Sequence, residues 1–189
     1  MVMKVIGLTG TIGSGKDVLR EILERKFNTV SVKLSNLLEN DVLKKKGISV
    51  TRTIQQNRGD ELRQNYGTYI LAKVAIEFMK KSNELKLIDG IRNPGEVDFL
   101  KKQFGDDFKL IAIDAPQQIR FERLQQRKRE SDPKSWEEFV VADERDQGIN
   151  QPEYGQQVRK CIEMADVVLQ NDGSLEEFQK KVEDVIKEL

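Results

Sequence analysis

The stretch Gly10-Thr11-Ile12-Gly13-Ser14-Gly15-Lys16-Asp17 follows the apolar run Val5-Ile6-Gly7-Leu8 and precedes residues 17–26, which have helical spacing. Its glycines allow successive backbone N–H groups to curl around a polyphosphate, and the N-terminus of the helix directs partial positive charge at the same oxygens. Lys16 adds a mobile cation. The sequence therefore predicts a loop that binds the phosphates of a nucleoside triphosphate such as ATP.

One position departs from the pattern G-x-x-x-x-G-K-[ST]. Asp17 stands where a Ser or Thr hydroxyl normally binds Mg²⁺. A carboxylate there can hold the metal, directly or through water, although it also places negative charge beside the triphosphate. The alternative is that Asp17 only stabilises the N-terminus of the helix. We keep Asp17 as a candidate metal ligand, with both alternatives open.

Composition limits the chemistry available to the chain. Its 189 residues are the length of one domain, and 32 basic residues match 32 acidic ones, so no overall positive field attracts nucleic acid. Histidine is absent and Cys161 is the only cysteine, which excludes disulfides, Cys/His zinc sites and histidine bases. Cys161 has apolar neighbours, so we expect it in the core. No signal peptide or apolar span is recognised, and we expect a cytoplasmic protein without membrane contacts.

Apolar runs alternate with segments of helical spacing along the chain. The runs predict strands at 4–8, 29–33, 85–89, 108–114 and 166–170. Such alternation predicts an α/β fold with a parallel sheet, helices on both of its faces and ligands at the carboxyl ends of the strands. Residues 54–81 are expected to form one or two helices, with a break near 66–68.

Two side chains lie at the carboxyl end of the predicted strand 85–89: Asp89 ends it and Arg92 follows it. Asp89 is expected to hold Mg²⁺, directly or through water, since its strand should lie near the phosphate loop. The alternative is a turn-forming Asp. Arg92 points to the same crevice, where its N–H donors suit an acceptor phosphate, unless it forms an ordinary surface ion pair.

A stripe of arginines marks the segment after Pro116. Arg120, Arg123 and Arg127 recur at i, i+3 and i+7, which places them on one helix face. A polar loop and a second helix follow, so we predict a helical lid at about 120–147. Closing it would expel water and bring Arg123 and Arg127 to the transferring phosphoryl group. Arg145, on the returning helix, is a further catalytic candidate, although its acidic neighbours favour a structural pair equally.

The acceptor is expected to bind in a helical region at about 35–82, between the second and third strands. Within it, Arg58-Gly59-Asp60-Glu61-Leu62-Arg63 supplies two guanidinium groups. Arg58 and Arg63 are candidates for holding an acceptor phosphate, while Arg63 has Asp60 and Glu61 as alternative partners.

With these residues in place, the chain resembles P-loop nucleotide kinases of the adenylate kinase and dephospho-CoA kinase group over most of its length. Residues 7–16 and 120–147 resemble the opening and the lid of dephospho-CoA kinases. An archaeal family of nucleotide-kinase-like proteins is more similar still, because it shares the motifs at 58–63, 89–92 and 132–139. The resemblance implies a single domain over 1–189 with the three-layer P-loop NTPase fold, a five-stranded parallel sheet of order 2-3-1-4-5 and a small helical lid.

The departures from this resemblance bear on the acceptor. Dephospho-CoA kinases carry an aspartate after the second strand, where this chain has Val32-Lys33-Leu34-Ser35-Asn36. A phosphate acceptor needs no base, because its oxygen is already ionised. The favoured prediction is a Mg²⁺-dependent kinase that transfers the γ-phosphoryl group of ATP to a nucleoside or deoxynucleoside monophosphate. A dephospho-CoA kinase with Asp89, Glu39 or Asp41 as base, and a non-catalytic ATP-sensing module, are the alternatives.

Overall fold

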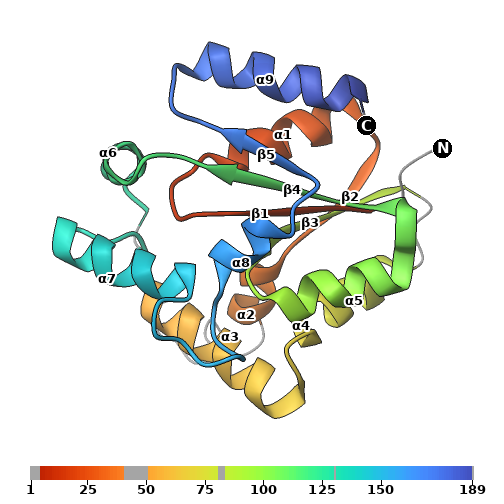
Figure 1. Cartoon of the computed structure of the whole chain (residues 1–189), viewed down its shortest axis with the longest axis horizontal. Coiled ribbons are helices and arrows are strands. Elements are labelled where there is room, and N and C mark those ends of the chain that lie inside the picture. Colours follow the sequence, from red (N-terminus) through yellow and green to blue (C-terminus); the bar gives the residue numbers. More distant parts are fainter. Residues whose placement is uncertain (1–4, 41–50, 81–83, 130, 189) are drawn as a thin grey trace.

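The computed structural model describes residues 5–40, 51–80, 84–129 and 131–188, and a parallel five-stranded sheet lies at its centre (Figure 1). The strand order is β2-β3-β1-β4-β5. The strands are β1 (Val5–Gly10), β2 (Thr29–Lys33), β3 (Leu85–Ile91), β4 (Phe108–Asp114) and β5 (Val167–Gln170). The predicted α/β class, the parallel sheet and its order are confirmed.

Helices cover both faces of the sheet. In Figure 1, α1 and α9 lie on one face, and α4, α5 and α8 lie on the other. The helices are α1 (Lys16–Lys26), α2 (Leu34–Asn40), α3 (Arg52–Tyr66), α4 (Ile70–Met79), α5 (Pro94–Phe104), α6 (Gln117–Arg127), α7 (Trp136–Gln147), α8 (Val158–Glu163) and α9 (Leu175–Glu188), with a 3₁₀ turn at Gly105–Asp107. None of these described helices combines the length and apolar character needed to cross a membrane.

The core has two layers because successive strand residues point to opposite faces of the sheet. Leu87 and Ile111 pack with the helices α1 and α9, whereas Ile88 and Leu110 pack with α4 and α5. Both faces are thus buried, which explains why the strands read as continuous apolar runs. Cys161 is fully buried in the second layer, as expected.

Several element boundaries differ from those predicted. The strand β1 extends to Gly10 rather than ending at residue 8, and β5 begins at Val167. The segment 54–81 forms two helices, α3 and α4, with the expected break at 66–68, where the φ of 99° at Gly67 favours glycine; α3 begins two residues earlier, and α4 ends two residues earlier, than the predicted segment. Helices α2 and α8 were not predicted, since seven and six residues are too few for a clear helical period.

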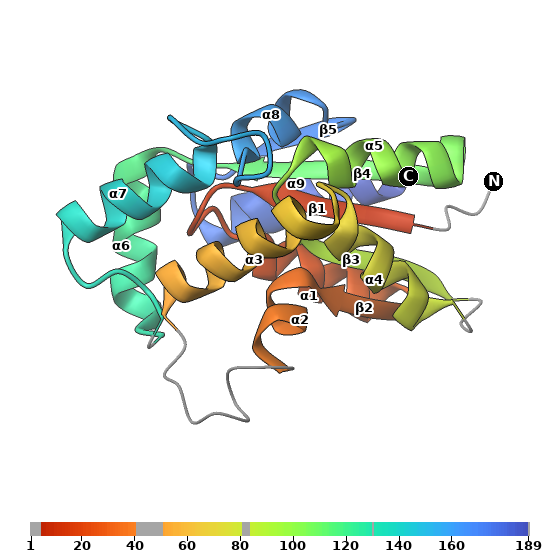
Figure 2. The ribbon, with the colours of Figure 1, turned by 90° about the horizontal axis from the view of Figure 1, so that it is seen from below.

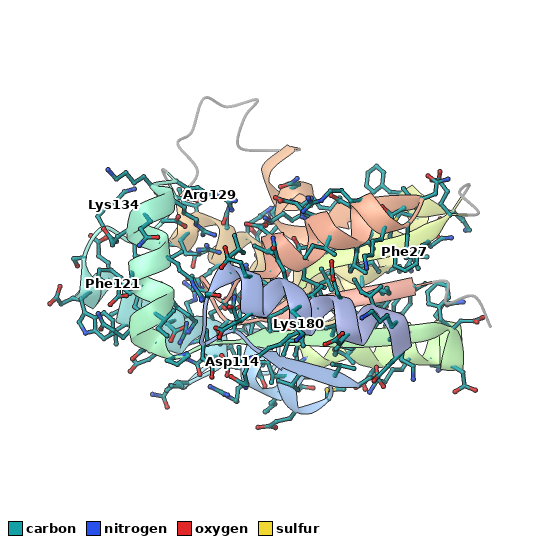
Figure 3. The ribbon with its side chains drawn as sticks, turned by 90° about the horizontal axis from the view of Figure 1, so that it is seen from above. Phe27, Asp114, Phe121, Arg129, Lys134 and Lys180 are labelled. Carbon is teal, nitrogen blue, oxygen red and sulfur yellow. The ribbon has the colours of Figure 1, made fainter. Side chains whose placement is uncertain are left out.

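The α6–α7 pair lies at one end of the sheet, next to α3 (Figure 2). Phe121 on α6 meets Trp136 edge to face and Phe139 at 5.4 Å between ring centroids, so these aromatic rings join the two helices. Figure 3 shows Arg129 and Lys134 at the far end of α6 from Asp114, which ends β4. Arg129, after α6, forms an ion pair at 2.8 Å with Asp17 in the first turn of α1.

Candidate functional site

The loop between β1 and α1 is held open by backbone geometry that suits glycine. Gly13 and Gly15 have φ angles of 78° and 105°. A Cβ on Gly13 would lie 2.7 Å from the carbonyl oxygen of Arg120. Asn171 braces the loop by donating to the carbonyl of Ser14 at 2.8 Å. Among the described residues, no side chain accepts from the backbone N–H groups of Gly13, Gly15 or Lys16, and all three residues line the adjoining cavity.

Lys16 curls back over this loop. Its Nζ donates to the carbonyl oxygens of Gly10 at 2.5 Å and Thr11 at 2.9 Å. Burial and the nearby positive charge of Arg92 lower the pKa of Lys16 to about 8, although Asp146 and Asp89 oppose the shift. Burial therefore outweighs the nearby carboxylates and disfavours the charged form of Lys16.

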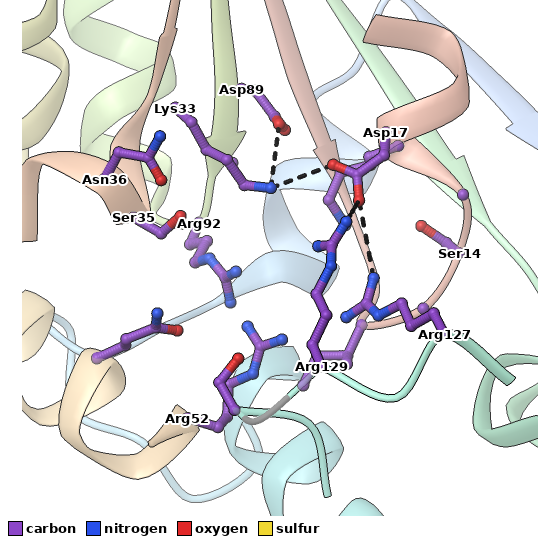
Figure 4. Close-up of a pocket in the computed structure, with 17 residues that line it drawn as sticks. Ser14, Asp17, Lys33, Ser35, Asn36, Arg52, Asp89, Arg92, Arg127 and Arg129 are labelled. Carbon is purple, nitrogen blue, oxygen red and sulfur yellow. Dashed lines mark hydrogen bonds and ion pairs between the residues drawn. The ribbon is translucent and has the colours of Figure 1, made fainter. Parts of the chain in front are cut away.

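A cavity of about 220 Å³ lies against the loop and collects basic side chains from five parts of the chain (Figure 4). Its cationic lining residues are Lys16, Lys33, Arg52, Arg92, Arg127 and Arg129. Against these six stand two carboxylates, Asp17 and Asp89. Ser35, Asn36, Gln55 and Ser131 add polar groups. This excess of positive charge in a hollow next to a phosphate loop suits a polyanion.

Asp17 is paired with cations. Its carboxylate accepts from Lys33 at 3.1 Å and from Arg129 at 2.8 Å, and lies 3.8 Å from Arg127. Burial opposes its ionisation, but Lys33 and Arg129 outweigh burial and hold the pKa of Asp17 well below its usual range. Asp17 is thus ionised and contacts Arg127 and Arg129 of the predicted lid region. It therefore does more than stabilise the N-terminus of α1.

Asp89 is a buried carboxylate at the carboxyl end of β3. It is 1% exposed, and within the described residues neither oxygen has a hydrogen-bond partner. Burial raises the pKa of Asp89, and Lys33, 3.9 Å away, only partly counteracts this. Such unsatisfied oxygens suit a cation, so Asp89 and Asp17 together fit a hard divalent ion such as Mg²⁺. No cluster of three or more acidic or Cys side chains suited to a metal occurs in the described part of the chain.

Arg52 and Arg92 face each other across the cavity (Figure 4). Burial lowers the pKa of Arg52 to about 10, and the positive charge of Arg92 contributes. Arg92 forms an ion pair with Asp146 of α7, whereas Arg52 lies 3.7 Å from the carboxylate of Asp132. Two guanidinium groups that raise each other's free energy create a position where an anion is stabilised.

Gly10 and Thr11, at the start of the predicted phosphate loop, do not line this cavity, and four predicted arginines also lie outside it. Arg123 donates to the backbone carbonyl and side chain of Asn171, at 3.0 and 3.1 Å, and so points to the loop after β5 rather than to the phosphate loop. Arg145 pairs with Asp60 at 2.8 Å between α7 and α3. The three arginines predicted to share one face of the lid helix therefore have different surroundings. Of Arg120, Arg123 and Arg127, only Arg127 lines the cavity.

The two arginines of the 58–63 motif are also separated from the cavity. Arg58 pairs with Glu61 at the surface, at 2.6 Å. Arg63 is 2% exposed and donates to Glu96 at 2.8–2.9 Å, which makes it a buried link between α3 and α5. Asp41 and the side chain of Glu39, considered as alternative bases, lie outside the described residues.

Sequence reasoning missed three cationic side chains of the cavity, Lys33, Arg52 and Arg129. Lys33 ends β2, and this position at the carboxyl edge of the sheet was the signal that could have identified it. Arg52 begins α3 after Thr51, whose hydroxyl accepts from Ile54 at 3.3 Å as an N-cap. No local sequence pattern distinguishes Arg52, which lines the cavity, from Arg58 on the same helix, which does not.

Known proteins share both sequence and fold with this chain. A family profile described as "AAA domain" matches residues 6–149. A UPF0200 protein of Methanothermobacter thermautotrophicus is 31% identical over 193 residues, covering 100% of this chain and 92% of that protein. A UPF0200/UPF0201 protein of Archaeoglobus fulgidus is 34% identical over 190 residues and 99% of this chain, which spans only 56% of that relative's length.

Solved structures show the same fold at low sequence identity. Shikimate kinase from Aquifex aeolicus has a TM-score of 0.55 and 18% identity, with 97% of this chain and 96% of that one covered. TT1252 from Thermus thermophilus has a TM-score of 0.57 and 21% identity, with 98% and 97% covered. The fold is therefore that of P-loop kinases, as the resemblance predicted. By the residues matched and the length shared, the chain belongs to the UPF0200 family and contains its P-loop AAA domain.

Proposed function

We propose that the protein is a Mg²⁺-dependent kinase that transfers the γ-phosphoryl group of ATP to a nucleoside or deoxynucleoside monophosphate. The observation that carries this proposal is the cavity beside the phosphate loop, whose lining combines six cationic side chains with two carboxylates. A donor triphosphate and an acceptor phosphate bring several negative charges to one place, which such a lining compensates.

In the proposed reaction, an acceptor phosphate oxygen attacks the γ-phosphorus and the bond to the β–γ bridging oxygen breaks, which leaves ADP. The loop N–H groups and Lys16 hold the donor phosphates. Arg127, with Arg129, approaches from the lid side and neutralises charge on the transferred group. Mg²⁺, held by Asp89 and Asp17, would supply further neutralisation when bound. Catalysis then needs positioning and charge, without a proton-accepting base.

The acceptor phosphate is assigned to the Arg52–Arg92 pair. The two groups face one cavity that also contains the phosphate loop, and both have donors suited to phosphate oxygens. Lys33, rather than a carboxylate, ends β2, which favours an ionised acceptor over a hydroxyl. Arg58, Arg63, Arg123 and Arg145 retain their proposed acceptor and catalytic roles only if their present ion pairs and hydrogen bonds are exchanged on ligand binding. The same proposal includes a single domain over residues 1–189, with an acceptor-binding region at about 35–82 and a lid at about 120–147.

The test is a panel of nucleoside and deoxynucleoside monophosphates and dephospho-CoA, each incubated with γ-labelled ATP and Mg²⁺. We expect label in one or more monophosphates and no transfer by Lys16→Ala, because that variant loses the donor-binding cation. Lys80→Ala is the matched control, since it also removes one lysine, from an exposed pair with Glu77, but leaves the cavity intact.

Two results would replace the proposal by a defined alternative. Label in dephospho-CoA alone would identify a hydroxyl acceptor and would make Asp89 the candidate base. Tight ATP binding without any labelled product would identify a nucleotide-sensing module. If Lys16→Ala turned over ATP as fast as the unaltered protein, the phosphate-loop assignment itself would be wrong.

A further inference from the structure

The ammonium group of Lys33 lies between the two carboxylates of the cavity. Its Nζ is 3.1 Å from Oδ1 of Asp17 and 3.9 Å from Oδ2 of Asp89 (Figure 4). These are the two side chains that fit a divalent ion on other grounds. A covalently attached cation therefore already stands where they converge.

The sheet register explains this placement. Lys33 and Asp89 are Cα partners in the parallel pair β2–β3. Side chains at paired positions of neighbouring strands emerge on the same face of the sheet, so the two residues are held together by the backbone. The first turn of α1 contributes Asp17 from above this face. The contact is thus built into three elements rather than formed by a mobile surface chain.

The surroundings of Asp89 favour a nearby positive charge. Its carboxylate is 1% exposed and without a hydrogen-bond partner in the described residues. A second cation, Arg20, lies 3.7 Å away but is shared with Glu24, to which it donates at 2.9 and 3.0 Å. A buried, unsatisfied carboxylate is costly unless a positive charge lies nearby, and of these two cations Lys33 is the one that also contacts Asp17 by a hydrogen bond.

We propose that Lys33 is a built-in cation of the metal site: its ammonium group occupies the position of a divalent ion between Asp17 and Asp89, and metal enters only by displacing it. The nucleotide-free protein then binds divalent ions weakly, and the metal arrives together with the triphosphate. This inference deepens the proposed function, because it concerns the same cavity. Its central test uses metal alone and needs no turnover.

The experiment titrates nucleotide-free protein with Mn²⁺ and reads the free ion by electron paramagnetic resonance. We expect Lys33→Met to bind Mn²⁺ at least about tenfold more tightly than the unaltered protein, since two carboxylates lose their internal counterion. Lys80→Met is the matched control: it removes a lysine from an exposed pair with Glu77 and should leave Mn²⁺ binding unchanged. Adding Asp17→Asn to Lys33→Met should abolish the gain.

Lys33→Gln serves as a second neutral variant if Lys33→Met does not fold, with circular dichroism as the criterion. A folded neutral variant that binds Mn²⁺ no more tightly than the unaltered protein would overturn the proposal. So would a tight, stoichiometric Mn²⁺ site in the unaltered protein that Asp17→Asn removes. Neither outcome depends on transfer to an acceptor, so failure here and failure of the proposed kinase activity are read separately.

Discussion

The guanidinium of Arg120 on α6 binds the carboxylate of Asp143 on α7 through two nitrogens, at 2.5 and 2.8 Å. The side chains are 3% and 0% exposed, and Arg120 also donates to the backbone carbonyl of Ile12 in the phosphate loop. One arginine thus joins the two lid helices to the loop that they cover. The spacing of the stripe indicated a shared face with Arg123 and Arg127, but Arg120 is a structural link.

We predict that Asp143→Asn destabilises the protein by about 3–5 kcal/mol, because it leaves a buried guanidinium without its charge partner. Urea unfolding followed by circular dichroism measures the change. Glu61→Gln, which breaks the exposed pair with Arg58, is the control and should cost less than about 1 kcal/mol. Equal effects of the two substitutions would show that the Arg120–Asp143 ion pair does not contribute more to stability than an exposed pair does.

Nucleoside triphosphate affinity should fall as the pH rises above about 8. The pKa of Lys16 in the ligand-free protein is lowered to about 8, and a bound polyanion raises it again. Binding near and above this pH therefore takes up a proton, which calorimetry in buffers of different ionisation enthalpy detects. Lys16→Arg stays charged and should lose this pH dependence. An affinity independent of pH from 7 to 9 in the unaltered protein would contradict the assignment.

Arg52→Met should raise the KM for the acceptor by about 10- to 100-fold, since hydrogen bonds to charged groups contribute about 1.5–3 kcal/mol. The KM for ATP should change less, because the phosphate loop holds the donor. Initial rates at varied acceptor and varied ATP concentrations give the two values, and Lys80→Met provides the comparison for loss of one charge. A change confined to the KM for ATP would place Arg52 with the donor instead.

Asp89→Asn should stabilise the ligand-free protein while it weakens Mg²⁺-dependent activity. Burial raises the pKa of Asp89 above its value in the unfolded chain, so its ionisation opposes folding as the pH rises through that raised pKa. Removing the charge is expected to raise the Tm at pH 7 by about 2–4 °C, which corresponds to about 1 kcal/mol for a chain of this size.

Below pH 3.8 the carboxyl group is protonated in both states, and the difference between Asp89→Asn and the unaltered protein should disappear. Thermal melts at pH 7 and at acid pH measure this. A lower Tm for Asp89→Asn at pH 7 would mean that the ion pairs with Lys33 and Arg20 outweigh the cost of burial.

The phosphate loop and the sheet were predictable from the sequence because both depend on local patterns. Closely spaced glycines and Lys16 between an apolar run and a helical segment specify a strand, a tight turn and a helix. The doubly buried strands read as apolar runs, and their alternation with helices implies parallel pairing. Asp89 and Arg92 could be placed at the cavity because both lie at the carboxyl end of one such strand.

The partners of individual charges were decided by tertiary structure. Arg120, Arg123 and Arg127 share a helix face, yet they bind Asp143, Asn171 and Asp132 on three different parts of the chain. Helical periodicity specifies a direction around one axis, whereas a partner depends on how separate elements pack. Lys33 meets Asp89 only through the register of two strands more than 50 positions apart, and Arg52 meets Arg92 only across a folded cavity. Such long-range pairings leave no trace in local spacing, so the fold alone assigns them.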